Sequence, residues 1–305
     1  CKLKFVECSY RPILDKKLFK QMFNFAGWQL FGCSADILRN QGISILLNIF
    51  TKTTIVNAAA GIAMSLNSII TAFVENFTAA FTPQITKLYA AKKYKELINI
   101  IYIGSKYAPF MMLLLAIPIY LNAEFILQIW LGQVPEHTIN FARITILYTL
   151  NELISLPLIR TKNATGKIRN YQIVVGGILL LTLPIAYIAL WLGAPIEFVF
   201  IAKVITSILA MLARLYMLRG DIPGLNSLHF LTNVYLRVII VAIIASIIPF
   251  VCYKCIPNQT LQFFSTSIIA VICTSITIYY LGCNKTEQEQ MKTQFHKLKL
   301  RILKK

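Results

Sequence analysis

The sequence has few charged residues and very few acidic ones. Charged residues make up 14% of its 305 residues, with 30 Lys and Arg against 12 Asp and Glu, whereas a soluble domain carries about 25%. Hydrophobic residues reach 57%, and the mean hydropathy is +0.66. Water is therefore not the main solvent of this chain, which excludes an ordinary soluble globular fold.

Motifs that bind nucleotides or metals are also missing. The sequence has no GxxxxGK[ST] phosphate loop, no HExxH and no nucleic-acid-binding module, and its three histidines stand far apart. Among seven cysteines only Cys252 and Cys255 have CxxC spacing, which alone is weak evidence for redox or metal chemistry. We therefore predict no enzyme activity, no metal, no cofactor and no nucleic-acid partner.

Long apolar runs recur along nearly the whole chain. A helix needs about 20 predominantly apolar residues to cross a bilayer. We predict an all-α polytopic membrane bundle of about eight transmembrane helices, with spans near residues 23–50, 55–82, 98–121, 137–160, 171–193, 196–218, 232–253 and 260–282. The chain begins with Cys1 rather than Met, so we expect the natural N-terminus to lie upstream.

Basic residues are concentrated in every second connection between the predicted spans. The N-terminal stretch, the loops around 83–97, 158–172 and 213–237, and the tail after 282 hold 24 of the 30 Lys and Arg. The opposite connections hold only Lys52 and Lys254. The positive-inside rule then predicts that both termini are cytoplasmic. The net charge of +18 is thus explained by loops that face anionic lipid rather than by nucleic-acid binding.

Polar residues follow one face of three predicted helices. A charge at mid-bilayer costs roughly 2.5 to 3.5 kcal/mol, so such residues should face a cavity, a partner or the interface. The stripes comprise Gln29, Cys33, Asp36, Asn40 and Ser44, flanked by Arg39, in the first helix; Asn57, Gly61, Ser68, Thr71, Glu75, Thr78 and Thr82 in the second; and Thr145, Tyr148, Glu152 and Ser155 in the fourth. We expect the first four helices to line a path.

Charged residues within the predicted spans have two interpretations each. Asp36 and Arg39 lie about midway along their span, which favours a cavity over an intrahelical ion pair without a transport role. Glu75 and Glu152 are candidates for proton or cation coupling, or for hydrogen bonds to a neighbouring helix. Lys106 lies nearer a helix end, which favours snorkelling to the interface over binding an anionic head group.

Two basic segments flank the predicted spans. Leu14, Leu18 and Met22 repeat at helical spacing among lysines near the N-terminus. Apolar residues repeat in the same way in the tail, at Met291, Phe295, Leu298 and Ile302. Each segment is interpreted either as an amphipathic helix on the membrane or as a solvated basic tail.

Three stretches carry a family likeness. They are residues 56–63 (VNAAAGIA), running on to 81–85 (FTPQI) and 87–90 (KLYA); residues 129–132 (IWLG), followed by Pro135-Glu136; and residues 164–168 (ATGKI), before Tyr171-Gln172. Together they resemble polysaccharide-repeat-unit flippases, of the O-antigen or capsule type, in the Multidrug/Oligosaccharidyl-lipid/Polysaccharide exporter superfamily.

The resemblance implies two helical lobes around a central cleft that opens alternately to each side of the bacterial cytoplasmic membrane. The eight spans would be the C-terminal lobe plus two accessory helices, with six further spans upstream. Residues 1–22 would be a cytoplasmic linker between lobes, 23–218 the six-span transport lobe, 219–282 the accessory pair and 283–305 a basic cytoplasmic tail.

The implied cargo is a polyprenyl-diphosphate-linked oligosaccharide. Arg39 would contact the diphosphate, and Asp36, Asn40, Glu75 and Glu152 would line the cavity, the three carboxylates serving as possible ion-coupling groups. Membrane lipids, and other polysaccharide-assembly proteins, are the expected partners.

Two other functions compete with this one. A cation-coupled exporter of drugs or metabolites from the same superfamily would share the fold but depend on its carboxylates. A membrane enzyme of glycan assembly would need acidic catalytic residues in a substantial external loop. The longest such loop offers only Glu124, Glu136 and His137, which disfavours the enzyme.

Overall fold

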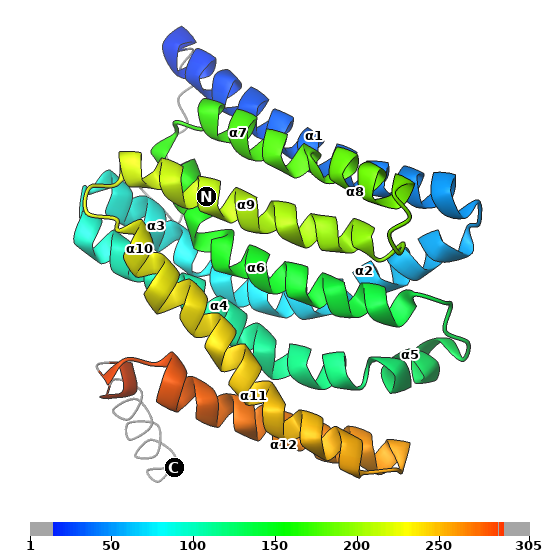
Figure 1. Cartoon of the computed structure of the whole chain (residues 1–305). Helices are drawn as coiled ribbons and strands as arrows, with labels where there is room; N and C mark the ends of the chain where they lie inside the picture. Colours follow the sequence, from blue (N-terminus) through cyan, green and yellow to red (C-terminus); the bar gives the residue numbers. More distant parts are fainter. Residues whose placement is uncertain (1–14, 286, 290–305) are drawn as a thin grey trace, which may run out of the picture.

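The computed structural model describes residues 15–285 and 287–289. These residues form helices and no strand, and most of the helices run along a common direction (Figure 1). Seven of the described helical segments are long and apolar enough to cross a membrane. The protein is therefore an all-α polytopic membrane bundle, as predicted. Leu14 and the apolar residues of the tail from Met291 onward lie outside the described residues.

Helices cover all eight predicted spans, and two further helices, at 81–90 and 123–131, lie mostly or wholly in predicted connections. In chain order the helices are α1 (Lys16–Thr51), α2 (Ile55–Ala79), α3 (Phe81–Ala90), α4 (Tyr94–Leu121), α5 (Ala123–Leu131), α6 (Thr138–Thr165), α7 (Arg169–Leu180), α8 (Thr182–Trp191), α9 (Phe198–Asp221), α10 (Ser227–Phe230), η1 (Leu231–Tyr235), α11 (Leu236–Cys255), α12 (Gln259–Thr277) and η2 (Ile278–Gly282), where η marks a π-helical turn.

α1 is long but too polar to count among the seven apolar spans. Its 36 residues extend about 54 Å, well beyond the roughly 30 Å hydrocarbon core of a bilayer. The Asp15 side chain caps its start by accepting hydrogen bonds from the backbone amides of Lys17 and Leu18, at 2.8 and 3.2 Å. α1 lies alongside α7 and α8 (Figure 1), where the predicted first span should be. Its polar stripe lowers its hydropathy.

The helical run that begins at Ile55 breaks near the end of its predicted span, and the run that begins at Arg169 breaks within its predicted span. α2 gives way to α3 at Ala80, and α7 gives way to α8 at Leu181. Each break comes three residues before a proline, Pro83 or Pro184. Proline lacks the amide that would bond the carbonyl one turn earlier, and its ring crowds that carbonyl. Both breaks therefore lie beside a proline, although Pro109, Pro118, Pro157 and Pro249 lie inside helices that continue.

The connections between helices gather at two ends of the bundle. One, here called the basic end, carries the start of α1, the α3–α4 and α6–α7 connections and the segment between α9 and α11 (left in Figure 1). The opposite end carries the connections around 52–54, 132–137, 193–197 and 256–258. This alternation matches the predicted charge asymmetry. That the basic end is cytoplasmic stays a prediction.

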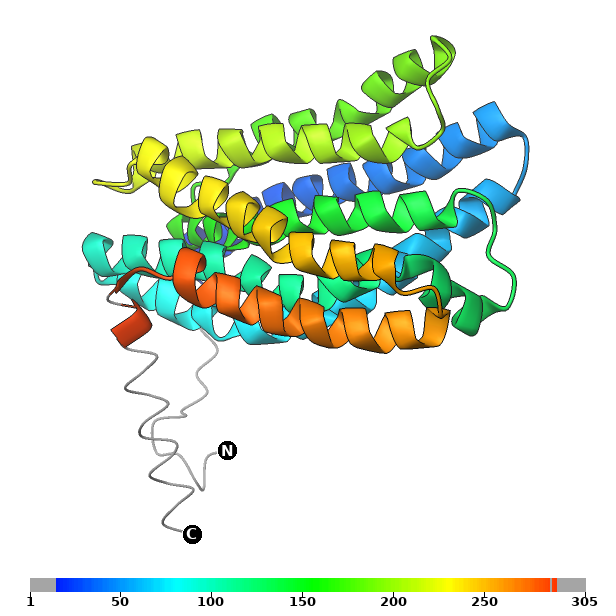
Figure 2. The ribbon, with the colours of Figure 1, turned by 60° about the horizontal axis from the view of Figure 1, so that its bottom comes forward.

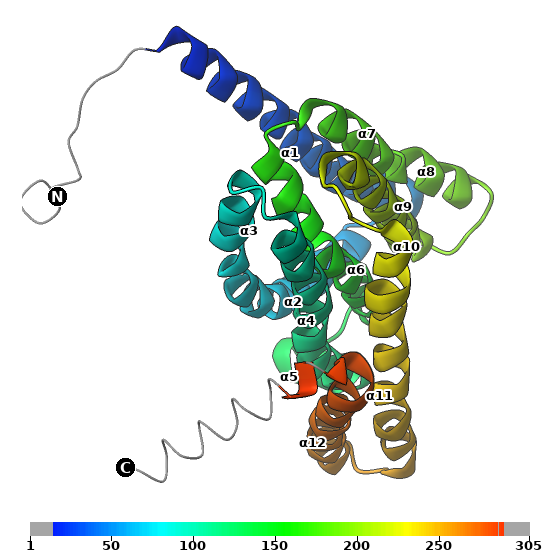
Figure 3. The same ribbon diagram turned by 90° about the vertical axis from the view of Figure 1, so that its left-hand side faces the viewer.

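α6 is the central helix of the bundle. It packs against α2, α3 and α4 on one side and α9 on the other, as Figure 3 shows in a view onto the basic end. The Phe141 ring of α6 stacks on Phe200 of α9 with centroids 4.5 Å apart. α11 and α12 lie side by side and attach through α4 (Figure 2). Side chains of α6 and α9 are thereby placed near mid-bundle.

Lysines near the basic end form buried ion pairs. Lys106 Nζ lies 2.6 and 2.7 Å from the two carboxylate oxygens of Glu287, and both side chains are largely buried. The predicted snorkelling of Lys106 is therefore wrong, because its partner comes from beyond α12. Lys162 of α6 pairs in the same way with Asp221 at the end of α9. These pairs tie distant parts of the chain together where the helices end.

Gly42 allows α1 to approach α8 closely. A Cβ at this position would lie 2.6 and 2.7 Å from the two δ carbons of Leu183, whereas a Cβ at Gly177 would meet nothing within 4 Å. In Gly42→Ala the end of the Leu183 side chain must turn away, and a packing cost of about 1 kcal/mol should leave the free energy of unfolding nearly unchanged, because alanine also favours the helix. Gly177→Ala should raise it by about 0.5 to 1 kcal/mol, because alanine favours a helix interior. Detergent-titration unfolding of both variants checks this, and equal shifts would contradict it.

Candidate functional site

Arg39 connects α1 to α6 near the middle of the bundle. Its side chain is only 2% exposed, whereas that of Asp36 is 50% exposed. Arg39 Nη2 donates to Asp36 Oδ1 at 2.5 Å and to the Tyr148 hydroxyl at 2.9 Å. Asn40 Nδ2 donates to the other Asp36 oxygen at 3.3 Å. The intrahelical ion pair is therefore present, and it also reaches a second helix.

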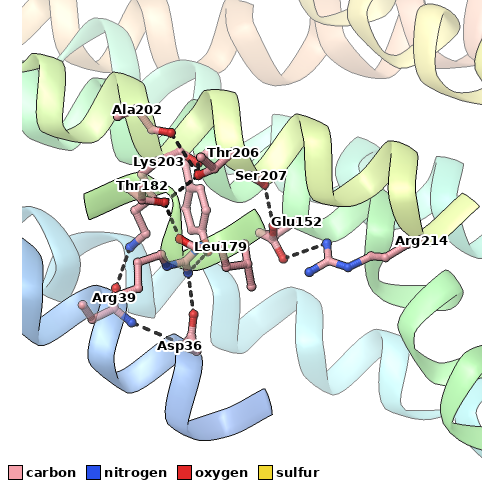
Figure 4. A network of polar contacts seen from close by, with 12 residues as sticks. Asp36, Arg39, Glu152, Leu179, Thr182, Ala202, Lys203, Thr206, Ser207 and Arg214 are labelled. Carbon is pink, nitrogen blue, oxygen red and sulfur yellow. Dashed lines mark hydrogen bonds and ion pairs between the residues drawn. The ribbon is translucent and has the colours of Figure 1, made fainter. Parts of the chain in front are cut away.

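Lys203 brings α9 into the same group. Its Nζ donates to Asn40 Oδ1 at 3.0 Å and lies 4.5 Å from the centroid of the Tyr148 ring. Arg39 Cζ lies 5.5 Å from the same centroid. The Tyr148 ring thus makes cation–π contacts with two buried side chains. Such contacts are more favourable when water is excluded. Figure 4 shows Lys203 and Arg39 converging from α9 and α1.

Glu152 forms a second polar group one helical turn from Tyr148. Its Oε1 accepts a hydrogen bond from Ser207 Oγ at 2.5 Å, and its Oε2 lies 3.5 Å from Arg214 Nη1 (Figure 4). Asn151 Nδ2 donates to the same serine hydroxyl at 2.7 Å. Residues four apart share a helix face. The two groups are therefore neighbours, and together we call them the central network: Asp36, Arg39, Asn40, Tyr148, Asn151, Glu152, Lys203, Ser207 and Arg214.

Several donors in the central network have no hydrogen-bond acceptor among the described residues. They include Nε and Nη1 of Arg39 and Nε of Arg214, all buried. An unpaired buried donor costs about 1 to 3 kcal/mol, and more when it is charged. The network also has three cationic side chains against two carboxylates. Its chemistry is therefore suited to accepting an anionic group or ordered water.

The structure brings together four of the five predicted site residues. Asp36, Arg39 and Asn40 share one hydrogen-bonded group, and Glu152 lies in the adjoining group. Glu75 is separate: it is exposed on α2, and its carboxylate contacts no polar partner within the described part of the chain. That these residues line a transport path stays a prediction.

Sequence reasoning did not predict a polar stripe on α9. Lys203, Ser207 and Arg214 all face the central network. At 100° per residue they fall within about 40° of one another on the helix, so α9 carries a polar stripe like those of the first helices. Counting stripes over all the predicted spans would have found it.

A carboxylate clasp joins α6 to α9 at the end opposite the basic end. His137 Nδ1 lies 2.7 Å from Glu197 Oε1, and Asn140 Nδ2 donates to the same oxygen at 3.1 Å. His137 has a left-handed backbone, with φ of 67°, and its ring stacks on Phe141. Burial alone would raise the pKa of Glu197, but the hydrogen bonds from His137 and Asn140 outweigh it and lower that pKa.

The clasp should stabilise the protein in a pH-dependent manner. A lowered carboxyl pKa contributes stability that is complete above the ordinary glutamate value of 4.5 and is lost as the pH falls through the folded-state value. Wild type should therefore melt at a higher temperature than Glu197→Gln at pH 7. The difference should shrink as the pH is lowered from 5 toward 3. A constant difference over this range would contradict the assignment.

One known protein family matches the part of the chain that holds most of this site. The MatE family profile matches residues 31–188, more than half of the chain, from the first half of α1 to α8. The chain belongs to the MatE family. Members of the MatE family are transporters rather than enzymes, and they belong to the exporter superfamily named above. This MatE protein is therefore an integral membrane transporter. No curated protein and no solved structure matches it significantly.

Proposed function

We propose that this MatE protein is a flippase for polyprenyl-diphosphate-linked oligosaccharides of bacterial cell-surface polysaccharides. The observation that carries the proposal is the Arg39 guanidinium, which is buried at mid-bundle with two of its three nitrogens lacking an acceptor. A diphosphate supplies several oxygens that match a guanidinium in a planar, bidentate arrangement. Lys203 stands beside it as a second cation.

The exposure of Asp36 supports access to this arginine. Asp36 is the one partner of Arg39 with half of its side chain exposed, so it can be exchanged for another anion at small desolvation cost. In this proposal the diphosphate binds Nε and Nη1 of Arg39, and Asp36 moves aside toward water. Asn40 and Glu152 then line the cavity next to the sugars, and Glu75 contributes from α2.

The remaining assignments belong to the same proposal. Residues 23–218 form the transport lobe and 219–282 the accessory pair, with the basic end and both termini in the cytoplasm. The transporter works in the bacterial cytoplasmic membrane beside other polysaccharide-assembly proteins. Residues 1–22 link this lobe to the upstream one, and residues 283–305 form the basic tail.

Deletion of the gene tests the proposal. A flippase mutant should accumulate lipid-linked glycan on the cytoplasmic leaflet and lose surface polysaccharide, with unchanged susceptibility to drugs. Plasmid-borne wild type should restore export. Normal surface polysaccharide together with increased drug susceptibility would contradict the flippase.

A cation-coupled exporter of drugs or metabolites is the second candidate. It is favoured by the accessible carboxylates, because Asp36 is half exposed and Glu75 is exposed. In that case a proton or metal cation would bind where Asp36 now pairs with Arg39. Increased drug susceptibility of the deletion strain, reversed by wild type but not by Asp36→Asn, would support this candidate over the flippase.

A further inference from the structure

A large cavity lies at the basic end, apart from the central network. Its volume is about 990 Å³, and it is bounded by the first turns of α1, the α6–α7 connection and the end of α9. None of the central-network residues lines it. Trp28, the lining residue of α1 nearest to Asp36 along the chain, lies eight residues from it, which is about 12 Å along a helix. The cavity is therefore separate from the central network.

One wall of the cavity is basic. Lys167 and Arg169 line it, are exposed, and have no carboxylate partner among the described residues. Lys162 also lines it, but its charge is balanced by Asp221. The Arg169 guanidinium stacks over the Trp28 ring at 5.4 Å, which holds the side chain in place while leaving its N–H groups available.

The start of α7 adds to the positive potential of this wall. α7 begins at Arg169, and no side chain caps its first turn. Ile168, Arg169 and Asn170 all line the cavity. Unpaired amides at a helix start attract anions, particularly phosphate groups. Two unpaired cations and this helix start therefore converge on the same space.

The α1 side of the cavity is mainly apolar, although Gln21 and Asn24 also line it. Leu18, Met22 and Phe25 of α1 line the cavity, and their side chains are among the exposed hydrophobic groups of the protein. Free phosphate or a nucleotide would bury none of these apolar side chains. A lipid would bury them against its acyl chains, which is favourable. We propose that the cavity binds the phosphate head group of an anionic membrane lipid. The site goes beyond the proposed function, because it would serve a flippase and a drug exporter alike.

The fluorescence of Trp28 gives a direct test. The background variant Trp130→Phe/Trp191→Phe leaves Trp28 as the single tryptophan. With the full chain in detergent micelles, titration with dioctanoyl phosphatidate should change Trp28 emission saturably, and dioctanoyl phosphatidylcholine should not. Lys167→Gln/Arg169→Gln should weaken phosphatidate binding at least about tenfold, because hydrogen bonds to charged groups are lost. Lys87→Gln/Lys95→Gln removes equal charge elsewhere at this end and should bind like the background.

The outcomes separate the possible ligands. Equal weakening in both double variants would show attraction by general positive charge, which overturns the proposal. Inorganic phosphate that binds as tightly as phosphatidate would show a free-anion site, which also overturns it. Thermal unfolding provides a second readout: phosphatidate should raise the melting temperature of the background and the Lys87/Lys95 variant, but not of the Lys167/Arg169 variant.

Discussion

Replacing Arg39 with Ala should reduce export of lipid-linked glycan by about 100-fold. The two guanidinium nitrogens that lack an acceptor would each lose a charge-assisted bond to phosphate worth roughly 1.5 kcal/mol. Arg39→Lys should fall between Arg39→Ala and wild type, since an ammonium keeps the charge but not the bidentate geometry. The measurement is surface polysaccharide in the deletion strain complemented with each variant.

The control for this prediction is another arginine. Arg219 lies near the end of α9 and is exposed without a carboxylate partner in the described structure, so Arg219→Ala should export glycan like wild type. Protein in the membrane is quantified for every variant, because Arg39→Ala leaves a buried cavity and a Tyr148 hydroxyl without its partner, which lowers stability as well. Wild-type export by Arg39→Ala at normal protein level would remove the proposed phosphate contact.

Replacing Glu152 with Ala should lower the free energy of unfolding by about 3 kcal/mol, because it leaves a buried guanidinium without its carboxylate. Arg214 is 5% exposed and Glu152 25%. Arg214→Leu should cost less, since the remaining carboxylate keeps its hydrogen bond from Ser207 and some solvent. The double variant Glu152→Leu/Arg214→Leu should recover most of the loss, because apolar pairs replace buried ion pairs well.

An exposed ion pair provides the matched comparison. Lys93 and Glu96 lie 3.2 Å apart, and both are more than half exposed. Glu96→Ala should change the free energy of unfolding by less than about 0.5 kcal/mol. Denaturation in mixed micelles measures all four variants. If Glu152→Ala were as mild as Glu96→Ala, the central network would not hold α6 to α9.

Composition and periodicity were enough to predict the membrane bundle. The long apolar runs predicted the spans, because a segment that crosses a bilayer must be both long and apolar. α1 illustrates the limit of this reasoning. Its polar stripe gives it too low a hydropathy for a span, yet the basic alternation across the other connections required a helix there.

The side-chain partners could not be predicted in the same way. Lys106 meets Glu287 and Lys162 meets Asp221 across long stretches of sequence, so no local pattern indicates either pair. The Asp36–Arg39 pair was predictable, because residues three apart meet on one helix. Its link to Tyr148 and Lys203 depends on how α1, α6 and α9 pack. Helix faces are thus predictable from the sequence, and their mutual orientation is not.

The accessibility of Cys33 to water tests the central claim, that the polar face of α1 borders an aqueous route. Cys33 is exposed and lies on the stripe with Asp36 and Asn40, whereas Leu38, 58% exposed, points about 140° away around the helix. With Cys33 as the single thiol, a charged methanethiosulfonate reagent should modify it readily in native membranes. Leu38→Cys, as the single thiol in a Cys33→Ser background, should react slowly, because a thiol in hydrocarbon stays protonated. Equally slow modification at both positions would contradict the aqueous route.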